Sequence, residues 1–274
     1  MIRLIATDID HTLLTSERVP HPRSAAAIRR AVEAGITVVL ASGRIGHSIR
    51  GISHMLELNG PIVGCNGADV FGPDDENWGH FRVDRASLDL ILDFAGEHNV
   101  QANVYTRRDV FFCGESEWSG RYLQRLNQTN DRHTVVPRST EEGHLRSLDV
   151  SKVLFVDDPE RIQRFRRQLE PLLNPYAIRV TESEPEYLEF LNMEASKGVG
   201  LRAIAERLGV PMEETAAVGD FLNDAEMLEA AGLSAAVGNA LLPIRHLADF
   251  TVGTNDEGGV GEFIEGILDG RWLQ

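Results

Sequence analysis

The sequence predicts an α/β protein: a doubly wound, Rossmann-like core built on a parallel sheet, with a second, α+β domain inserted into it. Three observations lead to this prediction. Apolar strands alternate with helical patterns near both ends of the 274-residue chain, and the alternation changes between residues 82 and 190. The first apolar strand ends in two closely spaced acids, at the position where open α/β sheets bind ligands. We therefore expect a core of residues 1–81 and 191–274 around an insert of residues 82–190.

Strands and helices alternate in the core at the spacing of βαβ units. Strands are expected over residues 3–7, 36–41, 61–65, 215–218, 233–237 and 250–252. Helices are expected over residues 22–34, in segments that end before Gly60 and Gly209, through Met227, and after the last strand. The two halves of the core should therefore form one parallel sheet.

The insert has a different order of expected helices and strands. Its expected elements are a helix over 85–97, a hairpin-like pair near 100–105 and 110–113, an Arg-rich helix near 118–126, and a strand, a helix and a strand over 152–180. The polar stretch 72–77 precedes the insert and supplies turn residues suited to the approach to a hinge.

Composition and charge exclude several classes of partner. With 42% apolar residues the chain can bury a sizeable core, and its net charge of -15 argues against nucleic acid or an anionic membrane as a partner. We expect neither a leader nor a membrane helix, because no apolar run approaches the roughly 18 residues that a bilayer requires. Cys65 and Cys113 lie in apolar stretches and are expected to be reduced core residues. A cytoplasmic protein follows, whose oligomeric state the sequence leaves open.

Lysine occurs only at Lys152 and Lys197, and every other basic residue of fixed charge is arginine. Where arginine is the default, a remaining lysine suits a compact charge beside a phosphate, which a flat guanidinium fits less well. Lys197 opens a predicted helix and is such a candidate. Lys152 begins an apolar strand, and the sequence indicates no chemical role for it.

The first strand runs directly into two carboxylates and a hydroxyl. Because side chains alternate along a strand, Asp8 and Asp10 project with the same sense, and Thr12 follows them. Three further groups lie just past other core strands or at a helix start: Ser42-Gly43-Arg44, Lys197-Gly198, and Gly219-Asp220 with Asn223-Asp224. A hydroxyl with backbone N–H groups could hold a phosphate oxygen, and the carboxylates could hold a divalent metal.

In order, these residues resemble the four signatures of haloacid dehalogenase superfamily phosphatases. Accessory stretches are similar to the Cof-type branch: Asn66-Gly67-Ala68, residues 227–232 with 238–240, and residues 248–260. That branch carries a large α/β cap between its second and third signatures, where the insert lies here. The resemblance implies that residues 82–190 are a cap that sets substrate specificity.

The resemblance also implies roles for individual residues. Asp8 would be the nucleophile that forms an aspartyl-phosphate, and Asp10 the general acid and then the general base. Thr12, Ser42 and Lys197 would hold the transferring phosphoryl oxygens. Mg²⁺ would be bound by Asp8, by the backbone carbonyl of Asp10 and by Asp220, with Asn223 and Asp224 orienting these ligands.

Substrate contacts are less well specified. Gly43, Arg44 and Asn66 are candidates in the core, and the insert offers Arg107, Arg108, Arg121 and Arg125. His11 stands where the family usually has glycine. Its backbone is either ordinary or its imidazole protrudes toward the cleft, and we favour a tolerated loop residue over a substrate contact.

The expected function is a Mg²⁺-dependent phosphatase that hydrolyses small phosphomonoesters, with sugar phosphates as the leading class. The partner would thus be a small phosphorylated metabolite. A phosphomutase is an alternative because it uses the same covalent intermediate. A non-enzymatic phosphoacceptor switch is another, but it has no need of a base at Asp10 or of a cap.

Overall fold

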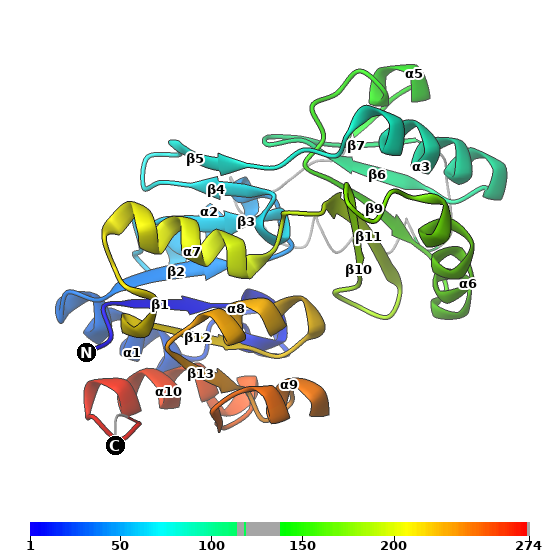
Figure 1. Ribbon diagram of the computed structural model, residues 1–274. Helices are drawn as coiled ribbons and strands as arrows, with labels where there is room; N and C mark the ends of the chain where they lie inside the picture. Colours follow the sequence, from blue (N-terminus) through cyan, green and yellow to red (C-terminus); the bar gives the residue numbers. More distant parts are fainter. Residues whose placement is uncertain (114–117, 119–137, 273–274) are drawn as a thin grey trace.

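The computed structural model describes residues 1–113, 118 and 138–272. Its larger sheet has the strand order β14-β13-β12-β1-β2-β3-β4-β5 (Figure 1). Six of these strands are parallel: β1 (Leu4–Thr7), β2 (Thr37–Ala41), β3 (Ile62–Gly64), β12 (Thr215–Gly219), β13 (Leu233–Ala236) and β14 (Phe250–Thr251). The predicted α/β core with a parallel sheet is therefore confirmed.

Helices pack on this sheet and complete one apolar core. They are α1 (Pro22–Glu33), α2 (Gly46–Met55), α7 (Lys197–Leu208), α8 (Ala225–Ala230), α9 (Leu242–Leu247) and α10 (Gly259–Leu268). Helix α1 lies against α10, and α7 lies against α8. Helix α7 begins where Ser196 Oγ accepts the Val199 N–H (3.1 Å) and ends at Gly209, whose φ is +63°. These ends place Lys197 in the first turn, at the sheet edge where the acids lie.

One part of the core was not predicted. Residues 69–80 form a hairpin of β4 (Asp69–Phe71) and β5 (Asn77–His80), which extends the sheet antiparallel to β3. Residues 72–76 of the stretch 72–77, which was expected to approach a hinge, form the turn of this hairpin, and the Gly72 N–H donates to the Glu76 carbonyl (3.0 Å). Strands this short carry too little alternation to be recognised from sequence.

The insert has its own sheet and its own apolar cluster. The strand order is β10-β11-β9-β6-β7-β8, and every neighbouring pair except β7–β8 is antiparallel. The strands are β6 (Ala102–Tyr105), β7 (Val110–Cys113), β8 (Arg138–Ser139), β9 (Lys152–Val156), β10 (Ile178–Thr181) and β11 (Tyr187–Asn192). The helices are α3 (Arg85–His98), α5 (Glu142–Leu145) and α6 (Pro159–Leu169). Except for Trp118, the Arg-rich helix expected near 118–126 lies outside the described residues.

The chain passes between the two sheets twice, after β5 and after β11 (Figure 1). The two linkers lie together, because Asn192 Nδ2 donates to the Arg82 carbonyl (2.9 Å). The domain boundaries at 82 and 190 stay predictions. Over the described residues, none of the helices combines the length and the apolar composition that crossing a bilayer would need.

Candidate active site

The first acid of the site lies directly after β1. The Asp8 N–H donates to the Val218 carbonyl on β12 (3.0 Å), which continues the parallel pairing by one residue. The Asp8 side chain is 7% exposed. The chain then turns through residues 9–13, and Thr12 is buried inside the turn.

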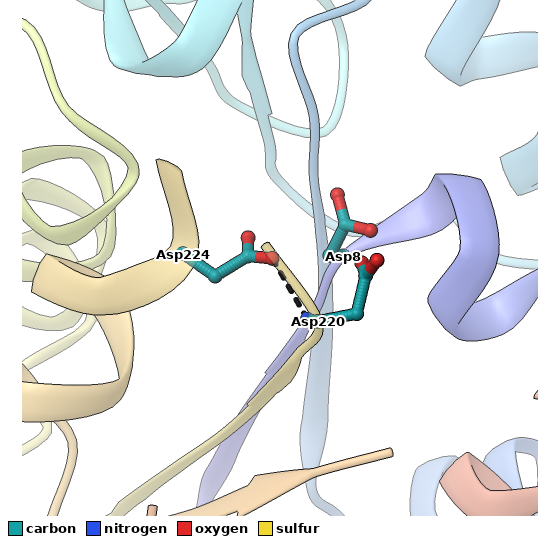
Figure 2. Close-up of side chains that lie close together, drawn as sticks. All are labelled: Asp8, Asp220 and Asp224. Carbon is teal, nitrogen blue, oxygen red and sulfur yellow. Dashed lines mark hydrogen bonds between the residues drawn. The ribbon is translucent and has the colours of Figure 1, made fainter. Parts of the chain in front are cut away.

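Two further carboxylates come from the loop after β12. Asp220 follows the strand directly, and Asp224 ends the short helical turn Leu222–Asp224. Asp224 Oδ2 accepts the backbone N–H groups of Asp220 (2.9 Å) and Phe221 (3.1 Å). Figure 2 shows the result: the side chains of Asp8, from the end of β1, and of Asp220 and Asp224, from the loop after β12, converge. One oxygen of each lies within 4.8 Å of the others.

Lys197 joins this group from α7. Its Nζ donates to Asp8 Oδ1 and to Asp224 Oδ1, both at 2.6 Å, and its side chain is 1% exposed. The first signature, the helix-opening lysine and the late Gly-Asp segment thus form one cluster, as expected for loops at the carboxyl ends of neighbouring parallel strands.

Burial raises the pKa of two carboxyl groups of the cluster, and the neighbouring carboxylates raise it further. Burial raises the pKa of Asp8, Lys197 lowers it and the other two carboxylates raise it again, so it lies well above its usual value. Burial and the charge of Asp224 raise the pKa of Asp220 to about 6. The pKa of Lys197 is lowered by burial and raised more strongly by its two carboxylates, so it stays charged. Crowded hard oxygen donors with surplus negative charge fit a divalent cation such as Mg²⁺.

Asp10 is not a member of this group of three carboxylates and is held by Arg44. Arg44 Nε donates to Asp10 Oδ2 (2.7 Å) and Arg44 Nη2 donates to Asp10 Oδ1 (2.5 Å), a bidentate pair. The Asp10 side chain is 44% exposed. Burial raises the pKa of Asp10, but the charge and hydrogen bonds of Arg44 outweigh it and lower the pKa below its usual value. The guanidinium therefore favours the carboxylate form.

The predicted phosphate-binding hydroxyls are close to these groups. Thr12 Oγ1 donates to Asp220 Oδ1 (2.7 Å), and Ser42 Oγ accepts the Arg44 N–H (3.2 Å). Both side chains are buried. Gly43 lies between Ser42 and Arg44, and a Cβ there would come within 3.1 Å of the Asn66 side chain. The structure thus brings together the residues of the second signature and the first.

Asn66 links the core to the insert. Its Oδ1 accepts from Asn223 Nδ2 (3.0 Å), and its Nδ2 donates to Glu189 Oε2 on β11 (2.5 Å). Asn66 is 3% exposed, so both ends of the amide are engaged by protein groups.

Sequence reasoning missed the partners that the insert supplies. Lys152, for which no role was expected, donates to Glu189 Oε1 and to the Gly43 carbonyl, both at 2.8 Å. Glu189 was not singled out either, because an acid inside an apolar strand gives no signal of its partner. The scarcity of lysine drew attention to Lys197, and the same argument marks Lys152 as unusual but does not indicate its partner.

His11 does not adopt an ordinary backbone conformation. Its φ is +60°, in the left-handed region that favours glycine. The imidazole extends to the insert, where Nε2 lies 3.1 Å from Glu184 Oε1. This hydrogen bond is the main reason that the pKa of His11 is raised to about 9.

The arginines expected to contact substrate are only partly placed. The Arg107 guanidinium lies 4.3 Å from the Phe71 ring centroid, on the core hairpin rather than at the acid cluster. Arg108 is exposed, and Arg121 and Arg125 lie outside the described residues. Both cysteines are unpaired, Cys65 fully buried and Cys113 half-buried.

The chain matches known proteins over nearly its whole length. The family model of haloacid dehalogenase-like hydrolases matches residues 5–264. Phosphatase YwpJ of Bacillus subtilis (strain 168) is 30% identical, with 97% of this chain and 100% of the relative covered. The 5-amino-6-(5-phospho-D-ribitylamino)uracil phosphatase YitU of the same organism is 31% identical, with 96% of each chain covered.

The structural comparison agrees. A solved haloacid dehalogenase-like hydrolase from B. subtilis superimposes with a TM-score of 0.85 at 27% identity, over 96% of this chain and 99% of the other. With its parallel core, its inserted α+β domain and an acid cluster drawn from core segments on both sides of the insert, the chain belongs to the haloacid dehalogenase-like hydrolase family.

Proposed function

We propose that this hydrolase is a Mg²⁺-dependent phosphatase that cleaves small phosphomonoesters, with sugar phosphates as the leading class, through an aspartyl-phosphate on Asp8. One observation carries the proposal. A buried lysine joins Asp8 to Asp224, and Asp220 completes a group of three carboxylates. An anionic nucleophile can attack a phosphate dianion only if positive charge is held near both.

The metal would be held by the side chains of Asp8 and Asp220 and by the backbone carbonyl of Asp10. When bound, Mg²⁺ supplies positive charge that offsets the repulsion between the nucleophile and the phosphate. Asp224 has one oxygen on Lys197 and the other on two backbone N–H groups, which suits an orienting role. Asn223 supports the same loop through its hydrogen bond to Asn66.

The remaining chemistry belongs to side chains of the chain itself. Asp8 attacks the phosphorus, and Lys197, Thr12 and Ser42 bind the phosphoryl oxygens, whose charge spreads in the transition state. Asp10 first protonates the leaving alkoxide and then takes a proton from the water that hydrolyses the acyl phosphate. Since Arg44 favours the carboxylate form of Asp10, the first of these steps requires Arg44 to release Asp10 as substrate binds.

The candidate substrate contacts divide accordingly. The Arg44 side chain is 20% exposed. Once Arg44 has separated from Asp10, its guanidinium can turn to the substrate. Gly43 offers its backbone, whereas Asn66 is engaged at both ends of its amide and takes a supporting position.

Two observations support a small phosphorylated metabolite as substrate. YitU is named for a substrate that carries a phosphorylated ribityl chain, and the insert contacts the core beside the site, as a lid over a compact leaving group would. Two unpaired cysteines are typical of a reducing compartment, which supports a cytoplasmic location.

The test uses p-nitrophenyl phosphate with and without added Mg²⁺. Turnover should require the metal, and Asp8→Asn should abolish hydrolysis while the circular dichroism spectrum stays unchanged. Asp10→Asn should slow the reaction by roughly 10²- to 10⁴-fold. Near wild-type turnover by Asp8→Asn would exclude Asp8 as the nucleophile.

The alternatives are separated by the product. A sugar monophosphate assayed for both free phosphate and positional isomers distinguishes hydrolysis from a mutase, which interconverts phosphate positions without releasing phosphate. A phosphoacceptor switch would instead accumulate a long-lived acyl phosphate on Asp8.

A further inference from the structure

A buried ion pair of the insert faces the core rather than the interior of its own domain. Lys152 begins β9 and Glu189 lies on the neighbouring strand β11, and their side chains are 3% and 1% exposed. Both partners reach out of the insert. Lys152 Nζ donates to the Gly43 carbonyl (2.8 Å), and Glu189 Oε2 accepts from Asn66 Nδ2 (2.5 Å).

These contacts continue without a break to the acid cluster. Asn66 Oδ1 accepts from Asn223 Nδ2, and the residue after Asn223 is Asp224, which binds Lys197. Gly43 lies next to Ser42 in the phosphate-binding loop. One ion pair of the insert therefore contacts, directly or through Asn66, two of the loops that form the site.

The charge of Glu189 sets the direction of the two hydrogen bonds that lead from Glu189 through Asn66 to Asn223. A carboxylate only accepts, so Asn66 must turn its Nδ2 toward Glu189 and its Oδ1 toward Asn223. Asn223 must then present its own Nδ2 to Asn66. Lys152 and Ser183 both donate to the other carboxylate oxygen of Glu189, which keeps that oxygen from competing for Asn66.

A neutral amide at position 189 removes this constraint. Either the oxygen or the nitrogen of this amide could face Asn66. If the nitrogen faces Asn66, it donates, and the Asn66 amide would have to flip to offer its oxygen. The flipped Asn66 would bring its Nδ2 against the Nδ2 of Asn223, where two donors cannot bond. Loss of one charge would thus leave the loop of residues 220–224 without a unique arrangement.

We propose that the Lys152–Glu189 pair is a positioning element for the active site. It fixes the Gly43 carbonyl from one side and the amide orientation of Asn66 and Asn223 from the other. Both residues act through others and touch no reacting group. The kinetic part of this inference rests on the proposed phosphatase function, whereas the ordering of the two loops does not.

A purely structural role makes a different prediction. If the pair only held the insert together, its loss would lower thermal stability and leave the folded enzyme unchanged. A control is available inside the insert: the Asp157 side chain is 2% exposed and pairs at 2.8 Å with Arg161, four residues along the same segment and 39% exposed at its side chain.

The experiment compares Glu189→Gln, the neutral double variant Lys152→Met with Glu189→Gln, and the control Asp157→Asn. Hydrogen–deuterium exchange of the metal-free protein is followed by mass spectrometry in segments 42–46 and 219–224. Hydrolysis of p-nitrophenyl phosphate gives kcat and KM separately, and calorimetry gives Tm.

We expect Glu189→Gln to speed exchange in both segments by about tenfold or more, as for loss of a hydrogen bond to a charged group. Its kcat should fall roughly ten- to hundredfold, with a smaller change in KM. The double variant leaves no unpaired buried charge, so its Tm should recover toward wild type while exchange stays fast and kcat low. Asp157→Asn should lower Tm alone.

The proposal would be overturned if the double variant recovered wild-type exchange and kcat together with its Tm. It would also be overturned if Glu189→Gln left exchange unchanged in both segments. If Glu189→Gln does not fold, the double variant decides by the same criteria. A wild-type protein without phosphatase activity would refute the proposed function, yet the exchange data would still decide whether the pair orders the two loops.

Discussion

Replacing Lys197 with methionine should destabilise the metal-free protein strongly. Lys197 Nζ is 2.6 Å from one oxygen of Asp8 and 2.6 Å from one of Asp224. At an effective dielectric constant near 20, each pair attracts by about 6 kcal/mol before desolvation is counted. Desolvation of the ammonium offsets much of this, and removing one partner of a buried pair typically costs about 3–5 kcal/mol. We expect that loss for Lys197→Met, or a fall in Tm of roughly 6–20 °C.

The assay is calorimetry in EDTA, with Asp224→Asn as the matched partner in a double-mutant cycle. Lys197→Met leaves Asp8, Asp220 and Asp224 without their cation, whereas the double variant removes one of those charges too. It should therefore be more stable than Lys197→Met alone. A loss below about 1 kcal/mol for Lys197→Met, or simple additivity in the cycle, would refute the electrostatic account.

Three other predictions concern the metal, a linker and pH. Millimolar Mg²⁺ should raise Tm because it binds only the folded cluster, and Asp220→Asn should remove most of the shift; an unchanged wild-type Tm would argue against the site. Gly67→Ala should destabilise the protein by more than about 1 kcal/mol, because φ is +96° and the new Cβ would lie 2.0 Å from the Ser196 carbonyl oxygen in the second linker. The control Gly35→Ala, with φ +82° and open space around the new Cβ, should destabilise it less. Arg23 holds the pKa of Glu265 below its ordinary value. The ion pair therefore stabilises the fold by at most about 1 kcal/mol at neutral pH, and this contribution disappears as acid protonates Glu265. Equal stability losses for Glu265→Gln in neutral and acidic urea titrations would contradict this.

The core could be predicted because local pattern and global fold agree there. Each parallel strand is a short apolar run followed by a helical period, and the acids follow the strands at one edge of the sheet. Asp8, Lys197 and Asp220 were therefore expected together before any contact was known. The β4–β5 hairpin escaped prediction because a strand of three residues has almost no period to detect.

Contacts between residues far apart in sequence could not be predicted from local pattern. Lys152 and Glu189 are far apart in sequence and become neighbours only when β9 and β11 pair. His11 shows the same limit in the backbone. Its left-handed φ is imposed by the turn around it, and its contact with Glu184 depends on where the insert sits.

The burial of both lysines leaves the surface without any ε-amino group. Lys152 is 2% exposed and Lys197 is 1% exposed, and the chain has no other lysine. Reagents that acylate lysine should therefore react slowly with the native protein. Acylation of Lys152 would then report separation of the insert from the core, and acylation of Lys197 would report opening of the core itself, so one chemical probe could time both motions.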